Sequence, residues 1–119
     1  MNIGADFKTL EVVGREHIRI YRALIAIEGS DEISESLAER SFCSVCGSAI
    51  WLWDPRWPDQ LHPHASAIDT ELPEPPKNWH MMLEFKASWV SPCLGANDRE
   101  FEEYPDESLV DWHLREALT

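Results

Sequence analysis

The chain is organised around residues 42–51, which read FCSVCGSAIW. Two cysteines separated by two residues, Cys43 and Cys46, are followed directly by Gly47 and a serine. A tight turn of this kind aims both sulfurs at one point, and a glycine in the left-handed conformation lets backbone N–H groups face them. The pattern is typical of a zinc knuckle, which supplies two of the four ligands of a tetrahedral site. We therefore predict Cys43 and Cys46 as zinc ligands in a site that is incomplete within this chain.

A redox dithiol and a pair of free thiols are the two alternatives for Cys43 and Cys46. A thioredoxin-type pair lies where a strand meets a helix, which lowers the pKa of the cysteine. Here the pair leads into residues 49–53, AIWLW, whose aromatic and β-branched side chains favour a strand. The sequence therefore favours zinc ligation over redox chemistry.

Three sources could complete the zinc site. His62 and His64 would share one face of a strand, although Pro63 makes that segment irregular, so we expect exposed loop histidines there. Cys93 follows a proline, and we expect it to be a lone thiol. A second copy of the chain could also contribute its own cysteine pair across a two-fold axis, as a homodimer. The sequence leaves these alternatives open.

The composition bounds the class of protein. The 119 residues are enough for one small domain, and 44% of them are hydrophobic, which is typical of a folded chain. With 22 acidic and 10 basic residues the net charge is −12, so binding to nucleic acid or to anionic membranes is disfavoured. Three cysteines argue against a disulfide scaffold, and we find neither a leader pattern nor a long apolar run. These features predict a soluble, cytoplasmic protein.

Hydrophobic patterning predicts a β-rich chain. The predicted strands are residues 17–27, 49–53, 61–68 and 79–85. Residues 30–40 are compatible with a helix, with a polar loop or with a ragged strand. We expect one helical turn capped by Asp6, and a short helix after residues 105–108 that buries Leu109, Trp112 and Leu114. The tryptophans Trp51, Trp53, Trp79 and Trp89 are predicted core residues.

Four segments in this order resemble the glutathione-dependent formaldehyde-activating family, which also contains centromere protein V. They are ERSFCSVCGS at residues 39–48, NWH at 78–80, KASWV at 86–90 and FEEYP at 101–105. A lone CxxCG motif is a weak signal, whereas the ordered set is fairly specific. The resemblance covers roughly three quarters of the chain.

The family resemblance implies a mainly β fold of several small antiparallel sheets, an Mss4-like or β-tent architecture, ending here in a short helix. Members of the family begin with a Cys-x-Cys-Gly segment that completes the structural zinc site, and a Cys-x-Cys-x-x-Cys cluster carries the catalytic zinc. This chain contains neither motif. We therefore expect a single domain over residues 1–119 that is truncated at its N-terminus relative to the family, with its catalytic residues unknown.

The implied chemistry is carbon–sulfur lyase chemistry, in which the thiol of glutathione adds to formaldehyde to give S-hydroxymethylglutathione. A small-molecule thiol such as glutathione is then the expected partner. The resemblance also reaches His80, which would line the substrate cleft or act as a proton donor, or else is a strand histidine whose ring nitrogens are satisfied by the backbone. Because the catalytic cluster is missing, we expect weak or no turnover. The alternative is a non-catalytic β-rich interaction domain with a partial or absent zinc site.

Overall fold

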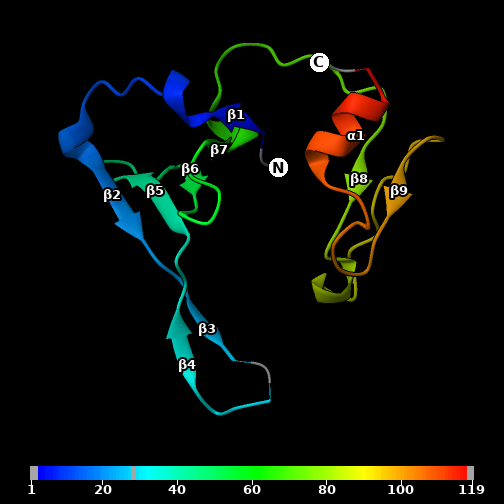
Figure 1. The fold of residues 1–119 in the computed structure, drawn as a ribbon, viewed down its shortest axis with the longest axis horizontal. Helices are drawn as coiled ribbons and strands as arrows, with labels where there is room; N and C mark the ends of the chain where they lie inside the picture. Colours follow the sequence, from blue (N-terminus) through cyan, green and yellow to red (C-terminus); the bar gives the residue numbers. More distant parts are fainter. Residues whose placement is uncertain (1–2, 28, 118–119) are drawn as a thin grey trace. The chain divides into compact units, whose positions relative to one another are not determined.

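The computed structural model describes residues 3–27 and 29–117, and it is mainly β with one short helix near the C-terminus (Figure 1). The chain forms two compact units, residues 1–71 and residues 72–119, and each is described by itself. The mainly β fold with several small antiparallel sheets is confirmed. The expectation of a single domain stays a prediction.

The first unit contains a five-stranded antiparallel sheet in the order β1-β7-β6-β5-β2. Its strands are β1 (Ala5–Asp6), β2 (Ile18–Tyr21), β5 (Glu39–Cys43), β6 (Ala49–Trp53) and β7 (Gln60–Pro63). Leu61, on β7, pairs with Ala5 on one side and with Trp53 on the other, and only 3% of it is exposed. The predicted strand at residues 49–53 is therefore the middle strand of the sheet.

A hairpin of β3 (Leu24–Ala26) and β4 (Ile33–Glu35) continues the β2–β5 pair (Figure 1). Of the alternatives for residues 30–40, the ragged strand is therefore the correct one, because β4 and the start of β5 are separated by irregular residues. The predicted strand over residues 17–27 is interrupted between β2 and β3, where Arg22 makes ion pairs with Glu35 at 3.8 Å and with Glu39 at 2.5 Å. These pairs link the hairpin to the main sheet.

The second unit is built on a short parallel pair, β8 (Trp79–His80) and β9 (Arg99–Glu100). Beyond this pair, the backbone N–H groups of residues 82–84 donate to the carbonyls of residues 101–103 at 2.9–3.2 Å. The α-helix α1 (Leu109–Arg115) begins after Ser108, whose hydroxyl accepts from the backbone N–H of Asp111. Among the described residues, no helix has the length and apolar character needed to cross a membrane.

Several predicted boundaries were wrong. The strand over 79–85 ends at His80, because Met82 adopts φ 60° and a 3₁₀ turn follows it. The strand over 61–68 ends at Pro63, and a 3₁₀ turn occupies Ala65–Ala67. The predicted turn capped by Asp6 is confirmed as a 3₁₀ turn.

The predicted core was also partly wrong. Of the three helix residues expected to be buried, only Trp112 is, with 7% exposed, whereas Leu109 and Leu114 are 46% and 63% exposed. Trp89 is 84% exposed, so its assignment to the core was wrong too. A seven-residue helix has a narrow contact stripe, and here that stripe is centred on Trp112.

A buried carboxylate fixes the loop after β6. Asp54, only 3% exposed, accepts from the backbone N–H of Arg56 at 2.9 Å and from its guanidinium at 2.9 and 2.5 Å. The side-chain hydrogen bonds from Arg56 hold the pKa of the Asp54 carboxyl below its ordinary value of 3.8. Because the folded-state pKa is depressed, this contribution to stability is present above pH 3.8 and is lost as the pH falls through the folded-state pKa.

We predict that Asp54→Asn lowers the free energy of unfolding at neutral pH by about 1–3 kcal/mol, because it removes charge-assisted hydrogen bonds to a buried acceptor. The difference from the wild type should shrink as the pH falls through the pKa of folded Asp54. Urea unfolding at several pH values measures both effects. The matched control is Asp59→Asn, which removes an exposed ion pair with Lys8 and should cost less than about 1 kcal/mol. Equal stability of Asp54→Asn and wild type at neutral pH would contradict the prediction.

Candidate functional site

The cysteine knuckle is the tight turn that joins β5 to β6. The Gly47 N–H donates to the Cys43 carbonyl at 2.8 Å, and the Cys43 N–H donates to the Ser48 carbonyl at 2.9 Å. Gly47 has φ 77°, the left-handed conformation expected from the sequence. The Ser44 N–H donates to the carbonyl of His17, the residue just before β2, at 2.8 Å. The cysteines therefore lie on a β turn, and not at the start of a helix.

The two sulfurs differ in exposure and lie close to each other. Cys43 is half-buried and Cys46 is exposed, and neither forms a disulfide. The Cys46 Sγ lies 3.3 Å from the Ser48 Oγ. Hydrogen bonds from the Ser48 hydroxyl and backbone N–H, and then from the Cys43 thiol, lower the pKa of Cys46 from its ordinary value of 9.0. The turn therefore favours a thiolate at Cys46, which is the form that binds a metal.

The donor set fits part of a zinc centre. Two adjacent sulfurs, one of them with a lowered pKa, match two positions of a tetrahedral site. In residues 3–27 and 29–117, no group of three or more His, Cys, Asp or Glu side chains is placed to hold a metal ion. His62 and His64 are therefore not gathered with the knuckle. Cys93 is an exposed thiol of the second unit.

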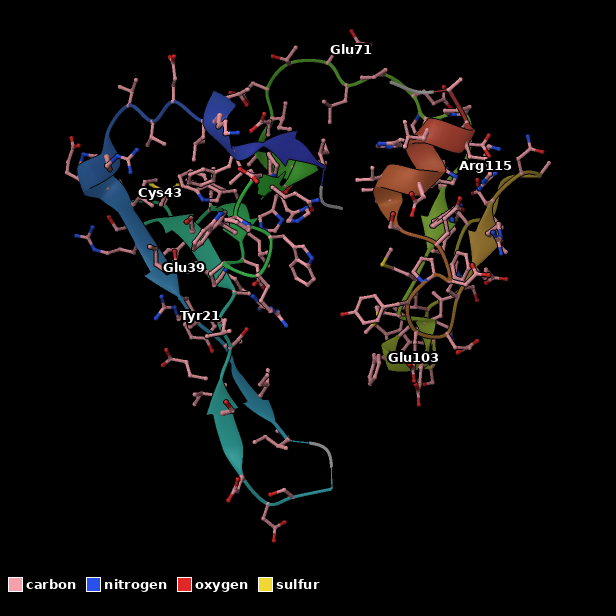
Figure 2. The ribbon with its side chains drawn as sticks, viewed as in Figure 1. Tyr21, Glu39, Cys43, Glu71, Glu103 and Arg115 are labelled. Carbon is pink, nitrogen blue, oxygen red and sulfur yellow. The ribbon has the colours of Figure 1, made fainter. Side chains whose placement is uncertain are left out.

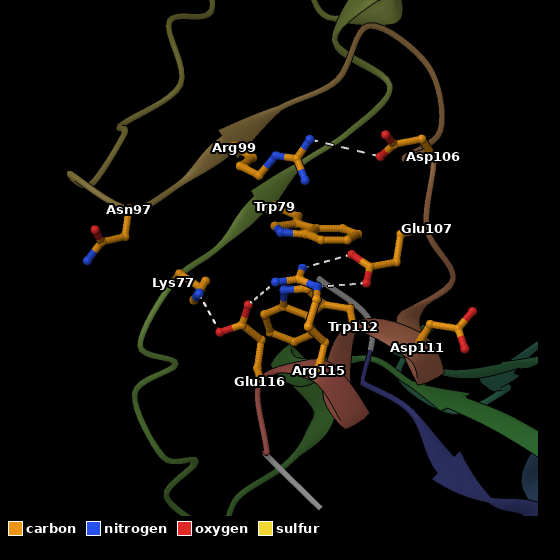
Figure 3. Close-up of a pocket in the computed structure, with 10 residues that line it drawn as sticks. All are labelled: Lys77, Trp79, Asn97, Arg99, Asp106, Glu107, Asp111, Trp112, Arg115 and Glu116. Atoms are coloured by element: carbon orange, nitrogen blue, oxygen red, sulfur yellow. Dashed lines mark hydrogen bonds and ion pairs between the residues drawn. The ribbon is translucent and has the colours of Figure 1, made fainter.

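The second unit contains a polar pocket of about 470 Å³ (Figure 3). It is bounded by β8, β9, α1 and the loop before α1. Its lining residues are Lys77, Trp79, Asn97, Arg99, Asp106, Glu107, Asp111, Trp112, Arg115 and Glu116. Three of these are basic and four are acidic, so the wall carries both signs of charge with a small acidic excess.

Two tryptophans form the apolar part of this pocket. The rings of Trp79 and Trp112 are 5.4 Å apart, and the Arg99 guanidinium lies 5.7 Å from the Trp79 ring centre and 4.8 Å from that of Phe101. Figure 3 shows the Trp79 ring between Arg99 on one side and Trp112 with Arg115 on the other. The pocket wall is thus made of tilted aromatic rings with a guanidinium over two of them.

The remaining charged side chains of the pocket wall are linked by a series of ion pairs. Arg115 makes a two-pronged pair with Glu107 at 2.8 and 2.9 Å and also pairs with Glu116. Glu116 in turn pairs with Lys77 at 2.5 Å. The hydrogen bonds from Arg115 lower the pKa of Glu107, and those from Lys77 lower the pKa of Glu116. These four charges largely neutralise one another.

His80 lies on β8, next to Trp79, and is oriented by a carboxylate. Its Nε2 is 3.2 Å from the Asp98 Oδ2, and Asp98 also accepts from the backbone N–H groups of Gly95 and Asn78. These backbone hydrogen bonds lower the pKa of Asp98 to about 2. His80 is therefore satisfied by a side-chain partner, and it is not one of the ten residues that line the pocket.

The sequence analysis missed the pocket. Trp79 and Arg99 meet only because β8 and β9 pair in parallel across 20 residues of chain. The one local signal was Arg115 at the end of a helix that follows an acidic stretch. Two of the segments that resemble the family, residues 78–80 and 101–105, do lie next to this pocket. They are neighbours in the structure, because the Phe101 N–H donates to the His80 carbonyl at 2.8 Å.

We predict that Ser48→Ala raises the pKa of Cys46, because it removes the hydrogen bond that contributes most to the lowered value. The measurement is the pH dependence of thiol alkylation at Cys46, followed by mass spectrometry on the metal-free chain. Ser44→Ala is the matched control, because this serine lies in the same turn and its hydroxyl is not a cause of the Cys46 shift. An unchanged alkylation midpoint in Ser48→Ala would contradict the prediction.

The comparisons with known proteins give one curated relative. It is a Halomonas elongata protein named "Putative glutathione-dependent formaldehyde-activating enzyme", 49% identical over 118 residues, which are 99% of this chain and 71% of the relative. No family model and no solved structure matches the chain. The aligned region includes the knuckle and the pocket segments, and the chain covers more than two thirds of the relative. The chain therefore belongs to the glutathione-dependent formaldehyde-activating family.

Proposed function

We propose that this protein binds zinc through Cys43 and Cys46 and takes part in glutathione–formaldehyde adduct chemistry of the carbon–sulfur lyase type. The observation that carries the proposal is the closed β turn, with adjacent sulfurs and a lowered pKa at Cys46, in a chain 49% identical to the named relative. The relative's name supplies the substrates. The geometry of the knuckle supports the metal.

The reaction forms one carbon–sulfur bond. The glutathione thiolate attacks the carbonyl carbon of formaldehyde, the C=O electrons move to oxygen, and that oxygen takes a proton to give the hydroxymethyl group. Cleavage is the reverse. Zinc, when bound, supplies Lewis acidity or a place for a thiolate. We assign Cys43 and Cys46 to holding the metal, and we assign no residue of this chain to catalysis.

The level of catalytic turnover we expect depends on how many zinc ligands the chain supplies. Two sulfurs occupy two of four positions in a tetrahedral site. Without two further donors from a second copy or from another segment, the site cannot present a complete zinc centre. We therefore propose that turnover by the 119-residue chain is weak.

A second candidate function is a non-catalytic interaction domain. It is favoured by the β3–β4 hairpin, where Leu24, Ile25 and Ile33 are each at least half exposed. Exposed large apolar side chains clustered on one hairpin are typical of interaction surfaces. Metal content and turnover separate the two functions.

We predict that the purified chain binds added zinc, and that Cys46→Ser binds it more weakly because one of the two proposed sulfur ligands is gone. Cys93→Ser is the matched control and should retain the metal, since that thiol lies outside the knuckle. A chelator should lower the Tm of the wild type by about 4 °C or more, because structural zinc contributes to folding free energy. Zinc content by mass spectrometry and thermal unfolding are the measurements. Equal metal content in wild type and Cys46→Ser would contradict zinc ligation by the knuckle.

We also predict that S-hydroxymethylglutathione forms only slightly faster with the chain than without it. The adduct is followed by NMR with glutathione and formaldehyde, and the spontaneous rate is the reference. Turnover well above that rate and abolished by a chelator would overturn the proposal of weak activity and would strengthen the assignment to lyase chemistry.

A further inference from the structure

The pocket of the second unit contains donors that lack an acceptor. The indole nitrogens of Trp79 and Trp112 are both buried, and no described side chain or backbone group accepts a hydrogen bond from them. Only 7% of Trp112 is exposed. A buried donor left unpaired costs about 1–3 kcal/mol, and native proteins keep few of them. Both indoles belong to residues that line the pocket, so their N–H signals report on a molecule that binds against this wall.

The charges of the pocket fall into two sets. Lys77, Glu107, Arg115 and Glu116 pair among themselves, as described above, and form a neutral inner wall. Arg99, Asp106 and Asp111 remain. Arg99 reaches Asp106 only at 3.9 Å, and that aspartate is 81% exposed, so the pair is weak. The outer set therefore offers one cation with uncommitted donors and two carboxylates.

The acidic and basic side chains of the pocket together determine which ligand charges it can accommodate. Four carboxylates against three cations disfavour a polyanion such as phosphate or a dicarboxylate. A molecule with one carboxylate and one ammonium close together matches both signs: the carboxylate can accept from Arg99, and the ammonium can face Asp106 or Asp111. A volume of about 470 Å³ is in the range of small-molecule sites.

We propose that the pocket between β8, β9 and α1 binds an α-amino-acid head group, with an ammonium and a carboxylate on one carbon. Free amino acids and short peptides both carry this group. Glutathione carries it on its γ-glutamyl residue, and the part of the inference that names glutathione rests on the proposed function. The proposal that the pocket binds an amino-acid head group does not rest on the proposed function, because the pocket residues are separate from the cysteine knuckle.

Indole N–H signals in ¹H–¹⁵N NMR spectra of the whole chain test the proposal. Glutamate, glutathione and S-methylglutathione at millimolar concentration should each shift the signals of Trp79 and Trp112, assigned by Trp79→Phe and Trp112→Phe. N-Acetylglutamate, which lacks the ammonium, and inorganic phosphate should bind at least about tenfold more weakly. The indole of Trp57, exposed in the first unit, is the internal control and should not move.

Arg99→Gln is the decisive variant and should weaken glutamate binding by about tenfold, because it removes the charge that faces the carboxylate. Its thermal unfolding confirms that the second unit is folded. Shifts with glutathione but not with glutamate identify a peptide as the source of the head group. Shifts with neither ligand, or binding of N-acetylglutamate equal to that of glutamate, overturn the proposal. No formaldehyde is present, so weak or absent turnover leaves this result unaffected, and loss of binding leaves the zinc assignment unaffected.

Discussion

A single tight turn places two sulfurs side by side, and the first unit is arranged on either side of that turn. The turn closes because the Gly47 N–H reaches the Cys43 carbonyl and because Gly47 adopts a positive φ at no steric cost. β5 and β6 leave it as antiparallel neighbours, and β2 and β7 add to their outer edges (Figure 2). The geometry of the sulfurs and the register of the central strands are thus set by the same few hydrogen bonds.

The second unit is held mainly by planar and charged side chains, in place of an aliphatic core. Among the described residues, Leu61 and Trp112 are the two buried hydrophobic side chains, and only Trp112 belongs to this unit. Trp79 packs against it at a tilt, with Phe101 on Trp79 and the Arg99 guanidinium over the rings of Trp79 and Phe101. Arginine packs its flat face on aromatic rings while its N–H groups stay available at the edges. A wall of this kind keeps polar groups beside apolar ones, which is how a small unit can be both a core and a binding surface.

The features that could be predicted from the sequence are those determined by residues close together in the chain. The knuckle was predictable because its two cysteines and its glycine lie within five residues, and the strand at 49–53 because aromatic and β-branched residues fill it. The end of the strand at His80 was not, because Met82 takes a positive φ that its residue type does not signal. The pocket was not predictable either, because Trp79, Arg99 and Arg115 come together only through tertiary pairing. The family resemblance indicated which segments matter without indicating their contacts.

The source of the lowered pKa at Cys46 favours metal binding over redox chemistry. In a redox dithiol the thiolate is stabilised by a helix N-terminus, whose aligned N–H groups act together. Here the stabilisation comes from one serine hydroxyl, two backbone N–H groups and the neighbouring thiol, and the sulfur is exposed to solvent. Such contacts orient a sulfur and lower the energy of its thiolate, while the sulfur itself stays exposed to a cation from solvent. Because the second sulfur lies on the same turn, a cation that binds one thiolate is brought to the other without further loss of chain entropy.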